Sequence, residues 1–211
     1  MKKIKVGVMG SASDTLPDGA TARLRERAEA LGRAISSESI LERIMSRDRA
    51  RSLEGINARP REIVLLTGAT TGLPYVVGRT AYDAGVFHIG VSPAGSREEH
   101  VSTYGLPTDA CDVLIYTGFG LKGRNVVLVR SCDIVLFIAG SIGALNELTI
   151  AYDEGRIIGC LTGTGGVADE AARLLETFSK KSRARAFHHD DPEHLLFECV
   201  HELLWPSAAA N

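Results

Sequence analysis

The sequence predicts an α/β protein built on a single doubly wound, mostly parallel sheet with helices on both faces. Short apolar runs alternate along the chain with segments whose apolar residues recur at helical spacing, a pattern typical of βαβ units. The 211 residues are enough for one domain with a sizeable core. We therefore expect one Rossmann-like domain over residues 1–206, with a helical insertion over 36–60 and a disordered tail over 207–211.

Each predicted strand is a short apolar run that ends at a small or polar residue. The run Ile134–Ile138 is the clearest, because it is apolar throughout, as expected of a parallel strand buried on both faces. By this criterion we predict strands over residues 4–9, 62–67, 86–91, 113–117, 133–139 and 157–162.

Each predicted helix has apolar residues spaced three and four apart. The last one also has a start signal, because Asp191 can cap its N-terminus and Pro192 suits its first turn. We predict helices over residues 19–35, 39–55, 73–84, 120–131, 144–154, 167–180 and 192–204.

The segment 36–60 differs from the rest of the chain in its arginine content. Ser39 and Glu42 form a capping box that indicates a helix start. Its arginines fit a long solvated helix, and they also fit an oligomer or ligand contact, since arginine suits interfaces.

Composition and charge exclude several classes of protein. The content of 45% hydrophobic and 24% charged residues is ordinary for a globular chain, and the net charge of −2 gives no general attraction to nucleic acid or to an anionic membrane. No apolar run approaches the roughly 20 residues of a membrane helix. The four cysteines form no CxxC pair, which favours a reduced, cytoplasmic setting.

The turn at residues 139–144 is the strongest functional signal. It links the apolar run 134–138 to a predicted helix and contains Gly140, Ser141, Gly143 and Ala144. A small-residue turn between a strand and a helix aims free backbone N–H groups at an anion, and the helix dipole favours negative charge there. Glu147, one turn past Gly143, lies near the same site.

Two further turns of this kind follow other predicted strands. Because the carboxyl ends of parallel strands share one edge of the sheet, three such turns indicate a nucleotide lying across that edge. The candidate phosphate- or nucleotide-binding residues are Gly10, Ser11, Gly68, Thr70, Thr71, Gly72, Gly140, Ser141, Gly143 and Ala144.

Two other motifs carry less weight. The GxGxxG pattern at 118–123 lacks the acidic residue that a dinucleotide site needs at the end of the next strand, which disfavours NAD. The cluster His188–His194 resembles a metal site, but it contains the helix-start signal at Asp191 and its consecutive histidines point in different directions. We therefore expect neither a metal nor another cofactor.

These motifs together resemble the Lonely Guy (LOG) family and its lysine-decarboxylase-like relatives, which are nucleotide-binding Rossmann-fold proteins. The stretch AGSIGALNE at 139–147 is similar to that family's PGGxGTxxE, and Arg124-Asn125 is similar to the Arg-Lys pair on its preceding helix. Gly10-Ser11 and TGATTGLP at 67–74 match its other glycine-rich turns. The likeness covers about residues 4–165, in the same order and strand context.

The resemblance implies a phosphoribohydrolase that cleaves a nucleoside 5′-monophosphate, such as AMP, to free base and ribose 5-phosphate. It also implies a homodimer or higher homo-oligomer, with Glu147 and Arg124 as the catalytic residues. This pairing is chemically reasonable, because a carboxylate stabilises oxocarbenium character and orients water. An arginine can hold that carboxylate and the substrate in register. A lysine decarboxylase is not expected, because no lysine lies in a cofactor-anchoring context.

The chain departs from the family pattern at Ala139, Ser141, Ala144, Asn146 and Asn125. In these departures the chain resembles the molybdenum-cofactor carrier proteins, and this resemblance implies the same fold with binding but no hydrolysis. The alternative function is therefore a non-catalytic nucleotide-binding or molybdenum-cofactor-binding protein. In that case Glu147 could serve only as a helix-dipole acid and Arg124 only as an exposed helical arginine.

Overall fold

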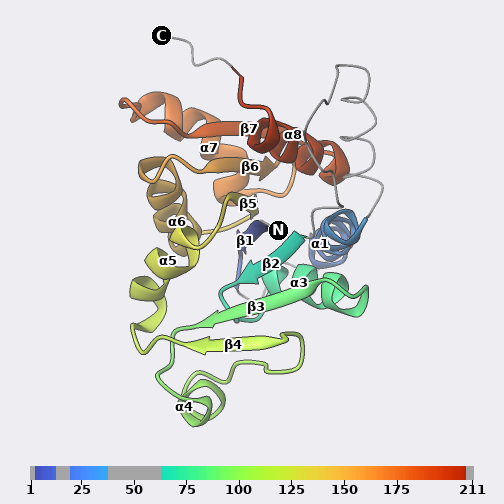
Figure 1. Cartoon of the computed structure of the whole chain (residues 1–211), viewed down its shortest axis with the longest axis vertical. Helices are drawn as coiled ribbons and strands as arrows, with labels where there is room; N and C mark the ends of the chain where they lie inside the picture. The colour runs from blue at the N-terminus through green and yellow to red at the C-terminus, as the bar shows by residue number, and fades with distance from the viewer. Residues whose placement is uncertain (1–2, 13–19, 38–62, 208–211) are drawn as a thin grey trace, which may run out of the picture.

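The computed structural model describes residues 3–12, 20–37 and 63–207 (Figure 1). Its strands are β1 (Ile4–Gly10), β2 (Ile63–Thr67), β3 (Phe87–Ser92), β4 (Val113–Tyr116), β5 (Ile134–Ile138), β6 (Ile157–Leu161) and β7 (Arg185–His189). Its helices are α1 (Ala20–Ser36), α3 (Leu73–Asp83), α4 (Arg97–Ser102), α5 (Gly120–Arg130), α6 (Ile142–Asp153), α7 (Gly166–Thr177) and α8 (Pro192–Leu204).

The described strands form one seven-stranded sheet in the order β4-β3-β2-β1-β5-β6-β7, and every neighbouring pair is parallel. The chain builds outward from β1 to β4 and then returns to place β5 on the other side of β1. The direction of winding therefore changes between β1 and β5. In open α/β sheets, a crevice for ligands forms beyond the carboxyl ends of the strands at this point.

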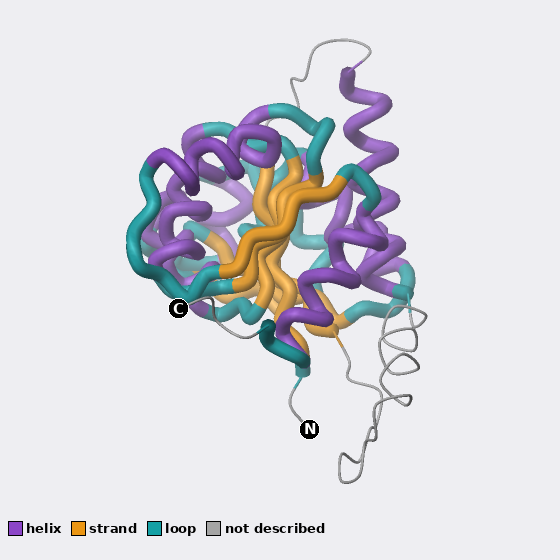
Figure 2. The backbone as a smooth tube through the Cα atoms, turned by 90° about the horizontal axis from the view of Figure 1, so that it is seen from above, coloured by secondary structure: helices purple, strands orange, loops and turns teal. Residues whose placement is uncertain are grey.

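Helices cover both faces of the sheet, as Figure 2 shows from above. Alternate side chains of the central strands point to opposite faces, so the sheet has two apolar cores. One core joins strand residues such as Val6 and Leu136 to α1, α3 and α8, and the other joins Val135 and Phe137 to α5, α6 and α7. The predicted doubly wound α/β fold is confirmed, with all strand pairs parallel rather than most of them.

Two elements were missed by the sequence prediction. Helix α4 has only six residues, REEHVS, which are too few to show an apolar period. Ser96 caps its N-terminus, because the Ser96 side chain accepts a hydrogen bond from the Glu99 N–H. Strand β7 is a half-buried edge strand, RAFHH, so its sequence does not read as an apolar run.

The remaining expectations concern segments that lie partly or wholly outside the described residues. The predicted helix 39–55 and most of the predicted insertion 36–60 lie outside the described residues. Ser207, expected to begin the tail, donates hydrogen bonds to the Glu202 carboxylate, and residues 208–211 lie outside the described part. Among the described helices, none is both long and apolar enough to cross a membrane.

Candidate functional site

A pocket of about 230 Å³ opens at the switch point, beyond the carboxyl ends of β1 and β2 and against the first turns of α5 and α6. Its walls therefore come from segments that are far apart in the sequence. The lining residues are Val8, Met9, Gly10, Ala12, Gly68, Thr70, Pro74, Leu121, Lys122, Arg124, Asn125, Ser141, Gly143, Ala144 and Glu147.

An ion pair between α5 and α6 forms one wall of the pocket. Arg124 Nη1 donates to Glu147 Oε1 at 3.1 Å and to Asn125 Oδ1 at 2.9 Å. Arg124 is 5% exposed and Glu147 6% exposed, so both charges are buried. Arg124 Nε is also buried and has no hydrogen-bond partner. The reading of Arg124 as an exposed helical arginine is therefore wrong.

Gly68 makes room for this arginine. A Cβ at position 68 would lie 2.2 Å from Arg124 Nη2 and 2.4 Å from its Cζ, far inside van der Waals contact. The sequence suggested Gly68 as part of a phosphate-binding turn. In the structure its lack of a side chain lets the guanidinium pack against the end of β2.

Burial determines the protonation of the pair. Desolvation raises the pKa of Glu147 to about 7, although the charges of Arg124 and Lys122 and the hydrogen bond from Arg124 lower it. The same desolvation lowers the pKa of Arg124. A carboxyl group poised near neutrality is suited to proton transfer.

The position of Glu147 also argues against a role limited to the helix dipole. Helix α6 begins at Ile142, two residues before the predicted start, and has no acidic residue in its first turn. The dipole effect is confined to that first turn. Glu147 lies beyond it and is held by Arg124 instead.

The turn between β5 and α6 is fixed on three sides. Ala139 and Gly140 have positive φ angles of 52° and 104°. Their carbonyl oxygens accept hydrogen bonds from the first N–H groups of α7, and the Ala139 N–H donates to Thr164 Oγ1 at 2.8 Å. The Gly140 N–H donates to Ser11 Oγ at 3.2 Å. The predicted anion-binding turn required this N–H to be free, and in the structure it is not. The N–H groups of residues 142–144 have no acceptor within the helix, and the Ser141 side chain does not cap them.

Three other predicted binding residues join the loops after β1 and β2. The Ser11 carbonyl accepts from the Leu73 N–H at 2.9 Å, and Thr71 Oγ1 donates to the Ala12 carbonyl at 2.8 Å. Gly72 has a φ of 78°, and a Cβ there would lie 2.2 Å from Ser11 O. Ser11, Thr71 and Gly72, like Gly140, thus support the pocket without lining it.

The other predicted site residues do reach the pocket, and their part in binding stays a prediction. They are Gly10, Gly68, Thr70, Ser141, Gly143, Ala144, Arg124 and Glu147.

Two lining residues, Lys122 and Asn125, were not among the predicted site residues. The available signals were the GxGxxG pattern, which contains Lys122, and the Arg124-Asn125 pair. Lys122 Nζ would lie 3.5 Å from a Cβ built at Gly143, which places a cation at the first turn of α6. Asn125 Nδ2 donates to Asn146 Oδ1 at 2.9 Å. These asparagines are two of the positions at which the chain departs from the LOG pattern, and the departures are matched to each other across the α5–α6 interface.

The weaker motifs take structural roles. Asp191 Oδ1 accepts from the His194 N–H at 2.7 Å, so it caps α8 as the start signal predicted. In the described part of the chain, no three His, Cys, Asp or Glu side chains are arranged to hold a metal. Gly118 and Gly120 of the GxGxxG pattern have positive φ angles, which form the tight turn before α5.

A model described as the SLOG cluster4 family matches residues 49–196. An uncharacterized protein from Archaeoglobus fulgidus is 29% identical over 114 residues, which are 54% of this chain and 68% of that protein.

Two solved structures resemble nearly the whole chain. The X-ray structure of TM1055, a structural genomics target, has a TM-score of 0.68 at 21% identity, with 94% of this chain and 99% of that chain covered. A molybdenum cofactor binding protein from Rippkaea orientalis has a TM-score of 0.62 at 23% identity, with 97% and 99% covered. At these identities, the likeness supports the fold alone.

The packing of Gly68 on Arg124 gives a first prediction. In Gly68→Ala the new methyl group displaces the guanidinium, which can move because it ends a flexible side chain. We expect the fold to survive, with a loss of about 1–3 kcal/mol in the free energy of unfolding because buried charges lose a hydrogen bond. The pKa of Glu147 should rise above 7, because the hydrogen bond and charge that lower it have moved. Carbon-detected NMR titration of the glutamate carboxyls and urea denaturation measure the two effects.

Gly95→Ala serves as the control, since a Cβ there meets nothing closer than Glu99 Oε2 at 3.4 Å. It should leave the Glu147 titration unchanged. A Gly68→Ala protein whose Glu147 titrates as in the wild type would contradict the role assigned to Gly68.

Proposed function

The chain belongs to the SLOG cluster4 family, and we propose that it binds a nucleoside 5′-monophosphate in the α5–α6 pocket and hydrolyses its N-glycosidic bond to free base and ribose 5-phosphate. The LOG-like resemblance of the sequence motifs is confirmed at the level of this superfamily. The observation that carries the proposal is the buried pair Arg124–Glu147, which holds a carboxyl group of near-neutral pKa beside a helix N-terminus.

The phosphate end of the ligand is assigned to the first turn of α6. Ser141, Gly143 and Ala144 line the pocket there, and the N–H groups of this turn lack intrahelical acceptors. Lys122 adds a positive charge next to Gly143. The LOG pattern has a threonine at the position of Ala144. Backbone N–H groups and a lysine together can replace the phosphate contact of that threonine's hydroxyl.

The ribose then lies toward Glu147. The pocket of about 230 Å³ is smaller than the roughly 300–1,000 Å³ of sites that enclose a whole drug-sized ligand. It suits the phosphate and ribose, and the base is placed at the rim. In this arrangement, the carboxylate of Glu147 faces the anomeric carbon and its attacking water.

The chemistry follows from these positions. As the bond from the anomeric carbon to the base nitrogen breaks, its electron pair leaves with the base and positive charge develops on the sugar. The Glu147 carboxylate stabilises that charge and accepts a proton from the water whose oxygen attacks the carbon. Arg124 fixes the carboxylate through Nη1.

A second candidate function is a carrier that binds a nucleotide or the phosphorylated molybdenum cofactor without hydrolysis. The observation that favours it is the paired replacement at Asn125 and Asn146, which changes the side chains next to Arg124 and Glu147. The structural neighbour from Rippkaea orientalis is described as a molybdenum cofactor binding protein. Both functions use the same anion-binding turn, so only the release of free base separates them.

Replacement of Glu147 tests the enzymatic function directly. In Glu147→Gln the shape and hydrogen bonding are kept while the charge is lost, so AMP should still bind. The release of adenine should fall at least tenfold, because the loss of one electrostatic contact to a transition state typically costs about 10²–10³ in rate. Chromatography of free adenine and calorimetric titration with AMP measure the two effects.

Glu154→Gln is the matched control, because Glu154 follows α6 and pairs with Arg130 at the surface. It should behave as the wild type. Tight AMP binding by a wild-type protein that releases no base would establish the carrier instead. Equal activity of wild type and Glu147→Gln would show that the catalytic site is elsewhere.

The raised pKa of Glu147 predicts two pH profiles. Since the ionised carboxylate is the active form, kcat/KM should rise about tenfold per pH unit below 7 and level off above it. The folded protein binds more protons than the unfolded chain between about 4.5 and 7, so the free energy of unfolding should fall as pH rises through that range. Steady-state kinetics and urea denaturation from pH 5 to 8 test both profiles. A rate that declines with rising pH would assign Glu147 the role of a general acid.

We also propose that the protein is a homodimer whose interface lies beside the pocket. Phe119, Leu121, Val126 and Ile142, on or next to α5 and α6, are 65%, 50%, 39% and 72% exposed. Two neighbouring valines of α5 do not belong to this surface, because Val129 is fully buried in the core and Val127 is partly buried against it.

Light scattering at micromolar concentration should therefore give twice the chain mass of 22.6 kDa. The double variant Phe119→Ser/Ile142→Ser should be monomeric with an unchanged fold by circular dichroism. A wild-type mass of one chain would reject the dimer.

A further inference from the structure

The structure assigns a second ligand site to the edge of the sheet opposite the α5–α6 pocket: a cavity that would bind a small anion with two or more phosphate groups. It has a volume of about 1070 Å³. Asp133, Arg156 and Arg185 mark its place, because they precede or begin β5, β6 and β7, whereas the α5–α6 pocket lies where strands end. This site does not depend on the proposed function.

The lining of this cavity is strongly basic. Five cationic side chains face two acidic ones, Asp133 and Glu202, in a chain whose net charge is −2. The five cations are Arg156, Lys180, Lys181, Arg183 and Arg185. Such a concentration of one sign in a concave surface raises the local concentration of counter-ions.

The two acids are already engaged. Asp133 accepts hydrogen bonds from the backbone N–H and the Nζ of Lys5, at 3.0 and 2.9 Å. Glu202 accepts from the N–H and Oγ of Ser207, and Arg185 Nε lies 3.6 Å from it. Neither acid is therefore free to neutralise the remaining cations.

The cations divide into anchored and free ones. Arg156 donates to the carbonyls of Cys132 and Arg130 at the end of α5, and Lys180 pairs with Asp153 at 2.6 Å. Lys181 and Arg183 have no acidic partner within ion-pair distance in the described part of the chain. They supply two unneutralised charges to one cavity.

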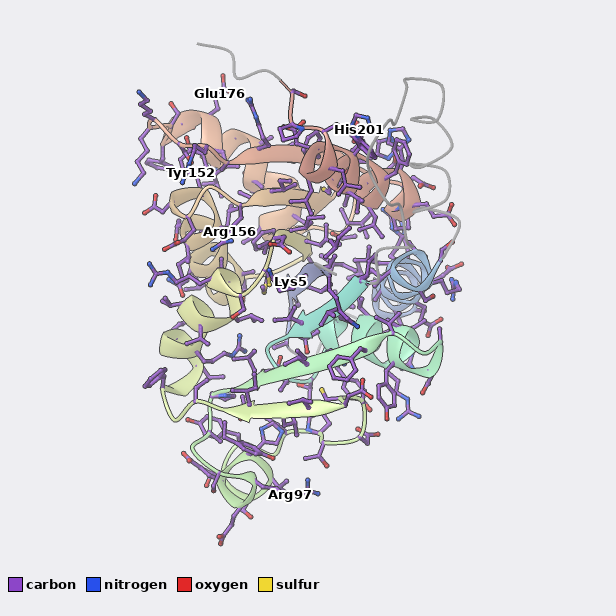
Figure 3. All side chains as sticks on the ribbon, in the orientation of Figure 1. Lys5, Arg97, Tyr152, Arg156, Glu176 and His201 are labelled. Atoms are coloured by element: carbon purple, nitrogen blue, oxygen red, sulfur yellow. The ribbon has the colours of Figure 1, made fainter. Side chains whose placement is uncertain are left out.

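The loop that carries these charges is held in place. Tyr152 Oη donates to the Lys180 carbonyl at 2.7 Å, and Ser182 Oγ donates to the Tyr152 carbonyl at 2.6 Å. Figure 3 shows Tyr152 and Arg156 in the same part of the molecule, with Arg97 at its opposite end. These bonds hold the backbone of the loop, so the exposed Lys181 and Arg183 stay beside the cavity and give it a positive potential that attracts anions. A ligand gives this arrangement a physical reason.

The size and lining of the cavity favour a small molecule over a polymer. Its volume is close to the upper limit of small-ligand sites, about 300–1,000 Å³. Ile157, Leu203 and Pro206 give it an apolar part beside the cations. A nucleic-acid surface instead presents a basic stripe over a face of the protein.

Calorimetric titration of the full chain with inorganic triphosphate tests the site. At low salt we expect saturable binding that is at least tenfold weaker in the double variant Lys181→Ser/Arg183→Ser. The control Arg23→Ser/Arg97→Ser makes the same charge change at exposed residues of α1 and α4, and it should bind within twofold of the wild type.

Three results would overturn the proposal. One is the absence of triphosphate binding at millimolar concentration, and another is unchanged binding by Lys181→Ser/Arg183→Ser. A 12-nucleotide single strand that binds more tightly than triphosphate, and loses this binding in the same variant, would identify a nucleic-acid surface. Release of base from AMP should be the same in this variant and in the wild type, so a failure here is distinct from a failure of the proposed hydrolase.

Discussion

The burial of one ion pair, Arg124–Glu147, explains much of the surrounding structure. Each buried charge costs several kcal/mol of desolvation, which is repaid only by close geometry and further hydrogen bonds. Asn125 takes a second hydrogen bond from the guanidinium, and Gly68 gives it space at the end of β2. These contacts compensate the desolvation only in part, because Arg124 Nε has no hydrogen-bond partner and the pKa of Glu147 is still raised. Such an incompletely compensated pair is more typical of a functional site than of a stabilising contact.

The pair faces a turn that is rigid for a different reason. Ala139 adopts a left-handed conformation that costs a non-glycine residue about 1–2 kcal/mol. Thr164, Ser11 and the start of α7 hold the turn by hydrogen bonds to its backbone. A Cβ at Gly166 would lie 2.1 Å from Gly140 O, so α7 packs directly on this turn. Strain that is maintained by so many contacts is characteristic of sites that must keep one geometry.

The carboxyl-terminal and amino-terminal ends of the strands differ in electrostatic character. At the carboxyl edge, opposite charges are paired and withdrawn from water, which suits the control of a proton. At the amino-terminal ends of β5, β6 and β7, like charges lie on and beside one loop, which suits attraction of a small anion with several negative charges. The same fold in proteins of about 20% identity does not decide either activity, because function depends on the side chains placed at such sites.

The sequence by itself determined the layered α/β fold, because buried parallel strands are recognisable as local apolar runs such as Ile134–Ile138. It also located the turn at 139–144 and Glu147, since both belong to one contiguous motif. Short or half-buried elements such as α4 and β7 left no local pattern. Only the tertiary structure showed that Arg124 is buried, because its burial depends on Gly68, a residue of a different βα unit. Hydrogen bonds and packing between distant segments, and the desolvation that this packing causes, decide which polar groups are free to react. The local periodicity of the sequence does not reveal these contacts.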